Sequence, residues 1–598
     1  MLSLADALQQ AGALYRAGEW DGAEKLCTAI LQLHPHQLQA IELLGTIAAQ
    51  TQRMPQAVDL LGRVVMARPN DPVAHTNYAS VLSLLGRFDE ALQSSDRALQ
   101  IKPDHAEAHC NRGAALQALG RPDEALQSLE RALQIKPHVV EAHSNRGNVL
   151  QALGRFDEAL LSYERALQIK PHYAEAHSNR GNVLQALGRF DEALLSYERA
   201  LQIKPHYAEA HSNRGNVLQA LGRFDEALLS YERALQIKPH YAEAHSNRGN
   251  ALQALGRLDE ALQSYNRAIS LQPDFLLAYK NRAYAELLAG NFTDGWLDHE
   301  WRWKGVIDAR FPHGSRWLGR ESLIGKTIVL HSEQGLGDAL QFSRYVKQVA
   351  DLGATVILEA PGQLATLLGN LPGLSQLVVR GEQLPAFDYH CPLMSLPLAF
   401  RTSLSTIPAQ VPYVVSDSIK RRFWMEHLGV WTRPRVGLVW SGGFRPNQPD
   451  VWPVNSRRNV PLAKLSVLSN PDIAFYSLQK GEQAESELAE LKAAGWQGPD
   501  LIDFTHALDD FSDTAALIDN LDLVISVDTS VAHLAGALAK PVWIMNRFDT
   551  CWRWLLNRTD SPWYPTARLY RQQRVGDWDE VIERIRIDLY KTRLDRRV

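Results

Sequence analysis

Apolar and polar residues follow two different patterns, one in each half of the chain. From about residue 4 to about residue 309, small and apolar residues recur at helical spacing, and Gly and Pro interrupt them at fixed intervals. This pattern predicts pairs of helices joined by short turns. From Lys326 onward, short apolar runs alternate with Gly-rich turns and helical stretches. Such alternation predicts parallel sheets flanked by helices, with binding sites at the carboxyl ends of the strands.

The helix pairs repeat with a period of 34 residues. This period is typical of tetratricopeptide repeats, which stack into a solenoid with a concave binding face. In the unit that begins at Ala174, we expect Gly181 at the closest contact between the two helices and Tyr197 in the core. One unit earlier, Gly154 is suited to ending a helix. An asparagine marks the same place in seven units: Asn77, Asn111, Asn145, Asn179, Asn213, Asn247 and Asn281.

These asparagines predict a groove for an extended protein acceptor. Each lies on the first helix of its unit, and first helices line the concave face in this repeat class. A row of amides is suited to gripping a peptide main chain. The alternative is that the amides only cross-link adjacent repeats. Recurrent histidines are expected to pack structurally, because imidazoles one repeat apart, roughly 10 Å, are too distant to share a metal ion. These are His109, His143, His177, His211 and His245.

The second half predicts two α/β units in succession. Helices are expected at 339–352 and 577–595, and a cleft between the two units, which join near 416–434. Three tryptophans within residues 296–303 indicate a connector that docks the solenoid onto this half. The predicted strands are 327–330, 354–358, 388–389, a segment around Val414, 435–440, 474–478, 523–527 and 541–544.

Composition narrows the function classes. The chain has 598 residues, enough for several domains, and a net charge of −4, so bulk charge gives no reason to expect nucleic acid as a partner. No apolar run reaches the ~18 residues of a membrane span, and the N-terminus is interpreted as the first repeat. Four cysteines without metal or disulfide spacing fit a reducing cytoplasm.

A first candidate site is the turn Gly335-Leu-Gly-Asp338, which follows a predicted strand. Its glycines, Gly335 and Gly337, let the backbone turn tightly and approach a ligand closely. Asp338 then opens a helix. The alternative is that Asp338 serves only as an acidic residue at a helix N-terminus.

A second candidate site is the segment Asp528-Thr-Ser530, where a buried strand ends and a helix begins. The hydroxyls of Thr529 and Ser530 lie beside the N–H groups of a helix N-terminus, which favours a pyrophosphate. Asp528 is placed to accept hydrogen bonds from sugar hydroxyls. Ordinary helix capping is the alternative, and His533 is equally well interpreted as a core histidine.

Three further residues are candidates for binding a donor substrate. Ser441 belongs to a strand end rich in small residues, and Arg458 is in a basic pair that follows it. Lys480 stands at the end of another predicted strand, where its charge would neutralise a phosphate. A solvated surface lysine is the alternative at that position.

Two motifs resemble the heptosyltransferase-like glycosyltransferases of two-lobed GT-B fold: G-L-G-D at 335–338 and D-T-S-V-A-H-L-A-G-A-L-A-K-P at 528–541. The repeat half resembles the solenoid of O-linked N-acetylglucosamine transferase. Together they resemble bacterial repeat-bearing glycosyltransferases, some of which modify flagellin. The resemblance implies Asp338 as general base, Asp528 as donor-binding residue, and phosphate contacts from Thr529 and Ser530. Ser530 replaces the family's glycine and is expected to narrow the donor site.

We therefore expect an α-solenoid followed by a GT-B domain: repeats 1–309, linker 310–325, N-terminal lobe 326–415, nucleotide-sugar-binding lobe 434–575 and a terminal helix 576–598. The expected function is an inverting glycosyltransferase that uses a nucleotide sugar and a protein acceptor, for which a flagellin-like protein is one candidate. No D-x-D motif stands at a strand end, so we expect no metal and no cofactor. A glycan or lipid acceptor and a non-catalytic scaffold are the alternatives.

Overall fold

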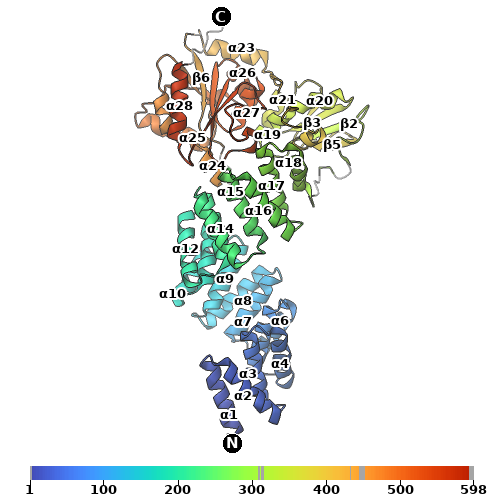
Figure 1. The fold of residues 1–598 in the computed structure, drawn as a ribbon, viewed down its shortest axis with the longest axis vertical. Helices are drawn as coiled ribbons and strands as arrows, with labels where there is room; N and C mark the ends of the chain where they lie inside the picture. Colours follow the sequence, from blue (N-terminus) through green and yellow to red (C-terminus); the bar gives the residue numbers. More distant parts are fainter. Residues whose placement is uncertain (1–2, 307–309, 312–314, 431, 444–451, 592–598) are drawn as a thin grey trace. The chain divides into compact units, whose positions relative to one another are not determined.

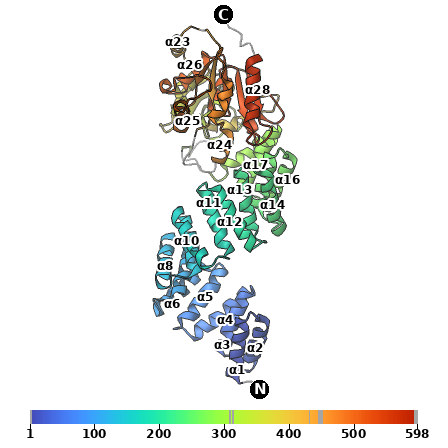
Figure 2. The same cartoon turned by 90° about the vertical axis from the view of Figure 1, so that its left-hand side faces the viewer.

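The computed structural model describes residues 3–306, 310–311, 315–430, 432–443 and 452–591. It divides into two compact units, residues 1–214 and 215–598, each of which we describe by itself. The first unit consists of antiparallel helix pairs stacked in sequence (Figures 1 and 2). The second unit begins with the last repeats and continues into two parallel sheets. This architecture confirms the predicted solenoid followed by a two-lobed α/β domain of GT-B type.

The solenoid helices alternate between a first and a second helix of each pair. First helices are α1 (Leu4–Arg16), α3 (Leu38–Gln50), α5 (Pro72–Leu84), α7 (Ala106–Ala118), α9 (Val140–Ala152), α11 (Ala174–Ala186), α13 (Ala208–Ala220), α15 (Ala242–Ala254) and α17 (Leu276–Ala289). Second helices are α2 (Trp20–Leu33), α4 (Met54–Ala67), α6 (Phe88–Ile101), α8 (Pro122–Ile135), α10 (Phe156–Ile169), α12 (Phe190–Ile203), α14 (Phe224–Ile237), α16 (Leu258–Leu271) and α18 (Phe292–His299).

Two glycines set the geometry of each repeat from α7 to α16. A Cβ atom on Gly181 would lie 2.7 Å from the Tyr197 ring, so only glycine lets α11 approach α12 this closely. Tyr197 is fully buried, as the sequence predicts. Gly154 follows α9 with a φ of +72°, a left-handed conformation in which glycine alone is unstrained. Both predictions about repeat geometry are confirmed.

The lobes of the second unit are parallel sheets with orders β1-β5-β2-β3-β4 and β11-β10-β9-β6-β7-β8. Around Val414, the described chain forms no strand, contrary to our prediction. Of the expected 577–595 helix, the part from 592 onward lies outside the described residues, as do 312–314 of the linker. The strands are β1 (Ser315–Arg316), β2 (Thr327–His331), β3 (Thr355–Ala360), β4 (Leu374–Val379), β5 (Tyr389–Pro392), β6 (Arg435–Val439), β7 (Ala474–Ser477), β8 (Leu501–Asp503), β9 (Leu523–Val527), β10 (Val542–Asn546) and β11 (Ala567–Arg571).

Helices cover both faces of the second sheet. One face packs against α25, α28 and η5, and the other against α26 and α27 (Figure 1). Short 3-10 turns, labelled η, connect several of the elements. The helices and turns of this part are η1 (Glu300–Trp303), α19 (Leu336–Phe342), η2 (Ser343–Tyr345), α20 (Val346–Asp351), α21 (Gly362–Leu368), η3 (Leu393–Ser395), α22 (Leu396–Ala399), α23 (Ser418–His427), α24 (Trp452–Arg458), η5 (Leu462–Leu468), α25 (Glu482–Ala493), η6 (Thr505–Ala507), α26 (Phe511–Asp519), α27 (Ser530–Ala537), η7 (Trp552–Trp554) and α28 (Trp578–Lys591).

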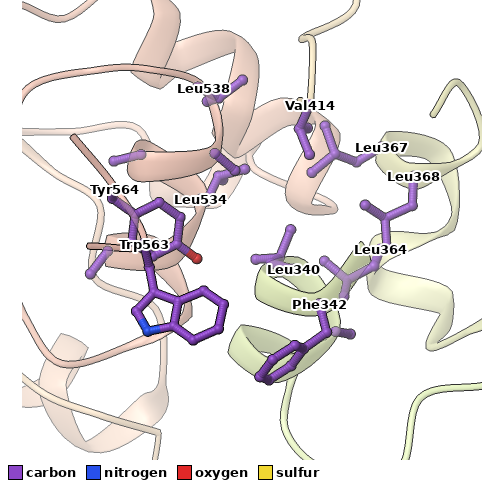
Figure 3. Close-up of a cluster of buried hydrophobic side chains, with 14 of the residues drawn as sticks. Leu340, Phe342, Leu364, Leu367, Leu368, Val414, Leu534, Leu538, Trp563 and Tyr564 are labelled. Atoms are coloured by element: carbon purple, nitrogen blue, oxygen red, sulfur yellow. The ribbon is translucent and has the colours of Figure 1, made fainter. Parts of the chain in front are cut away.

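One apolar core joins the two lobes. Leu340 of α19 and Leu364 of α21 face Leu534 of α27 and the ring of Trp563, as Figure 3 shows. Val414 is buried in the same cluster, which explains its apolar character in the absence of a strand. Because the core is shared, α19 and α27 are held next to each other, and the turns that precede them come together.

Candidate functional site

The turns before α19 and α27 enclose a cavity of about 640 Å³. The structure thus brings together two segments that lie far apart in the chain. Predicted residues that line the cavity are Gly335, Gly337, Asp338, Arg458, Asp528, Thr529, Ser530 and His533.

The Asp338 carboxylate is held by two partners. One oxygen, Oδ2, accepts a hydrogen bond of 2.9 Å from the backbone N–H of Gly335. The other oxygen, Oδ1, pairs with the guanidinium of Arg553 on η7. The helix starts at Leu336, so Asp338 lies in its first turn, and its bond to the Gly335 N–H caps the helix, as the alternative of a helix N-terminal acid predicts. Its carboxylate is 20% exposed and lines the cavity.

Arg553 is the partner that sequence reasoning missed. Its side chain is 11% exposed and also donates to Gln341 Oε1 at 2.8 Å and to Cys551 Sγ at 3.2 Å. Burial alone would lower the pKa of Arg553, but Asp338, Cys551 and Asp528 together outweigh burial and raise it. Arg553 therefore stays charged and fixes the orientation of Asp338.

The N-terminus of α27 forms the opposite wall. Thr529 is the N-cap residue, yet within the described structure its side chain makes no capping bond and lies 3.1 Å from Ser526 Oγ instead. The N-cap position thus falls on Thr529, not on Asp528 or Ser530. The carbonyl oxygen of Asp528 accepts a hydrogen bond of 3.1 Å from Arg458, which brings a second guanidinium into the cavity.

His533 lies where the two helices meet. Its Nδ1 is 3.0 Å from the Tyr564 hydroxyl, and its Nε2 is 3.9 Å from Asp528 Oδ1. Burial lowers the pKa of His533 to about 4, so the ring is neutral near pH 7. A Cβ atom on Gly337 would lie 2.8 Å from this ring. Glycine at 337 is therefore required by packing between the lobes.

Arginines dominate the charge of the cavity. Its described lining includes four arginines and two aspartates. Arg380 donates to Ser332 Oγ at 3.0 Å, and Arg547 follows β10 directly. The rule that sites lie at strand carboxyl ends would have indicated Arg547, whereas no sequence signal pointed to Arg553. A cationic cavity beside a helix N-terminus is suited to a phosphate-bearing ligand.

Two predicted residues lie elsewhere. Neither Ser441 nor Lys480 is among the described residues that line this cavity. Lys480 donates to the backbone carbonyl of Leu508. Ser441 lines a neighbouring cavity of about 650 Å³, and its backbone N–H donates to Gln479 Oε1 at 2.9 Å.

The recurrent asparagines of the solenoid cross-link adjacent repeats. Three of their amides donate to an asparagine of the repeat before: Asn179 to Asn148, Asn213 to Asn182 and Asn247 to Asn216, each at 2.9 Å. The others bond to the preceding repeat as well: Asn77 to Glu42, Asn111 to the Thr76 carbonyl, Asn145 to Cys110 and Asn281 to Ser246. This bonding is what the cross-linking alternative predicts, and it does not test binding of an acceptor.

The recurrent histidines bond within their own turns. His177 Nε2 lies 3.1 Å from the Pro171 carbonyl, and the histidines one repeat away on each side bond in the same way. Across the described ranges, no three His, Cys, Asp or Glu side chains gather as a metal site would require. In the same ranges, every helix is too short or too polar to cross a bilayer.

Known proteins match both halves of the chain. Residues 479–543 match glycosyltransferase family 9 (heptosyltransferase). Tetratricopeptide repeat families match residues 14–81, 72–138, 147–256 and 242–275. Protein FlbA of Caulobacter vibrioides is 28% identical over 328 residues, which are 50% of this chain and 52% of FlbA. The chain thus spans about half the length of this curated relative.

Among solved structures, the repeats are similar to TTC0263, a thermophilic tetratricopeptide protein of Thermus thermophilus. The two are 30% identical, with a TM-score of 0.28, over 31% of this chain and 100% of that one. YrrB, described as a tetratricopeptide protein with an unusual peptide-binding site, is 26% identical, with a TM-score of 0.27, over 31% and 95%. The chain joins tetratricopeptide repeats to a glycosyltransferase family 9, heptosyltransferase-like domain.

Proposed function

We propose that this protein transfers a sugar from a nucleotide-sugar donor to a hydroxyl group of a protein held by the solenoid. The observation that carries the proposal is the cavity between α19 and α27, because Asp338 lines it together with four arginines. The family 9 match over 479–543 supports sugar transfer, and the repeats support a protein partner. We propose a flagellin-like protein as one candidate for that partner.

The donor diphosphate lies against Arg380, Arg458 and Arg547 and the first turn of α27. Helix N–H groups and the helix dipole favour an anion at that position. Fixed positive charge stabilises the leaving diphosphate, so the reaction needs neither metal nor cofactor. Thr529 and Ser530 supply hydroxyls to the same phosphates, and Asp528 accepts from the sugar or ribose.

Asp338 is the general base. It takes the proton from the acceptor hydroxyl as that oxygen forms a bond to the anomeric carbon, and the bond to the diphosphate breaks on the opposite face. Attack from the opposite face inverts the anomeric configuration. Arg553 keeps the carboxylate directed into the cavity throughout. All four cysteines are free, three of them buried, which fits the cytoplasmic location that we propose.

A thermal-shift screen with UDP-, GDP-, ADP- and CMP-sugars tests the donor half of the proposal. We expect one donor class to raise the melting temperature, and Asp528→Ala and Thr529→Ala to reduce that shift. Intact-mass analysis of co-expressed proteins tests the acceptor half by a hexose-type increment. Donor binding without any protein modification would favour a glycan or lipid acceptor. No donor binding at all would favour a non-catalytic scaffold.

A further inference from the structure

Helix α24 carries two neighbouring arginines that face different parts of the second unit. Arg458 lines the cavity and donates to the Asp528 carbonyl at 3.1 Å. Arg457 donates instead to the solenoid, to the backbone carbonyls of Gln219 at 3.3 Å and Ala220 at 3.0 Å. These carbonyls end helix α13, where a cation is favoured by the helix dipole. A short helix therefore touches both the donor cavity and a repeat.

A shared carboxylate connects Arg457 to the cavity. Asp549 Oδ2 lies 3.0 Å from the Arg457 guanidinium and 3.4 Å from that of Arg547. The exposed fractions are 16% for Arg457, 11% for Asp549 and 12% for Arg547, so solvent screens this network weakly. Arg547 lines the cavity, whereas Arg457 is not among its described lining residues.

The solenoid turn between α13 and α14 is fixed closely against the lobe. The Phe224 ring is buried, and the Arg457 guanidinium lies 5.4 Å from its centroid. Gly222 has a φ of +76°, and a Cβ atom there would lie 3.0 Å from Val575 and 3.4 Å from Arg457. A displacement of this turn therefore moves Arg457, because the packing leaves little room to shift independently.

We propose that Arg457 is a positioning residue that couples the solenoid to the donor cavity. It does so by holding Asp549, and through Asp549 it fixes Arg547 where the donor phosphates bind. Arg457 thereby makes donor affinity depend on the position of the turn that follows α13. This inference rests on the proposed function, because it takes the cavity as the donor site.

The test is calorimetric titration of the full chain with inorganic pyrophosphate, the group shared by nucleoside diphosphate donors. Arg457→Ala should weaken pyrophosphate binding roughly fivefold, within the range of coupling between contacting residues. Arg457→Lys should retain part of the affinity, since a lysine keeps the charge but loses the fork. Val575→Ala is the matched comparison: it loosens the same turn but keeps Arg457 and Asp549 in place, so it should weaken pyrophosphate binding less than Arg457→Ala does.

A double-mutant cycle shows whether Arg457 acts through Arg547. If it does, Arg457→Ala should have little further effect in an Arg547→Ala background. Additive effects of the two substitutions on pyrophosphate affinity would overturn the inference. A second contradicting result would be an Arg457→Ala variant with a lower melting temperature but normal pyrophosphate binding, provided that Arg547→Ala binds pyrophosphate weakly. If Arg547→Ala leaves binding unchanged, the donor cavity itself is wrong, and the inference falls with it.

Discussion

The carboxylate of Asp338 both stabilises the fold and is the proposed general base. Oδ2 closes the turn by accepting from Gly335, and Oδ1 pairs with Arg553. Removing the charge of Asp338 therefore leaves Arg553 buried without its carboxylate partner. Such a loss is strongly destabilising in its own right, by about 3–5 kcal/mol in comparable buried pairs. A simple Asp338 variant thus confounds stability with catalysis.

A compensated pair of variants separates the two effects. We expect Asp338→Asn to reduce turnover by roughly 10²–10⁴-fold and also to lower the melting temperature. The double variant Asp338→Asn with Arg553→Gln should recover melting temperature, because no charge is left unpaired, yet remain inactive. Turnover and thermal unfolding are measured on the same preparations. Recovery of activity together with stability would rule out Asp338 as the base.

At the scale of elements, the site depends on how closely α19 approaches α27. Gly337 and His533 meet at this contact, and the His533 ring also contacts Tyr564 of the shared apolar core that Figure 3 shows. The cavity is therefore a consequence of helix packing between lobes. A side chain at 337 must push the His533 ring or separate the helices, and overpacking of this kind typically costs about 1–3 kcal/mol.

Gly337→Ala should accordingly lower the melting temperature and weaken donor binding together, since both depend on the same contact. Gly443→Ala is the matched control, because Gly443 lines the cavity but a Cβ atom there meets none of the described residues within 4 Å. Differential scanning calorimetry and the donor titration give both readouts. Equal behaviour of the two alanine variants would show that the approach of α19 to α27 does not limit the site.

At the scale of the whole molecule, the sequence predicted the secondary structure better than it predicted the tertiary contacts. The 34-residue period and the strand-and-turn alternation are encoded in consecutive residues, so the solenoid and most strands were predictable. The strand expected around Val414 was wrong because burial between lobes, not a sheet, requires an apolar residue there. The Asp338–Arg553 pair joins residues 215 positions apart, and no local signal marks it. Lys480 stands at a strand end but bonds to a carbonyl, which its sequence position does not determine.

The regular row of asparagine amides in the repeats also holds adjacent repeats together. Asn148, Asn182 and Asn216 each accept, at Oδ1, both a tyrosine hydroxyl of their own repeat and the amide of the next recurrent asparagine. The tyrosines donate at 2.7–2.8 Å and the asparagines at 2.9 Å. Cross-linking of adjacent repeats thus explains part of the 34-residue recurrence of the asparagines. An experiment on acceptor binding by these asparagines must therefore separate it from their effect on stability.

Two triple variants make this separation. Replacing Asn179, Asn213 and Asn247 by Ala removes three donors to the shared Oδ1 atoms. Replacing Tyr163, Tyr197 and Tyr231 by Phe removes the three other donors to the same atoms and leaves the recurrent asparagines in place. Each lost hydrogen bond costs about 0.5–1.5 kcal/mol, so both variants should lose melting temperature to a similar degree.

Each asparagine amide is expected to make one hydrogen bond to the main chain of the protein acceptor. Only the asparagine variant should therefore also raise the apparent Michaelis constant for the acceptor, by roughly tenfold. Donor hydrolysis without acceptor should be unchanged in both variants. The acceptor is the protein that gains the hexose-type mass in co-expression, and initial rates are measured against its concentration. Equal Michaelis constants in the two variants would mean that the asparagines serve the solenoid alone. The acceptor would then be recognised by other residues of the groove or by the N-terminal lobe.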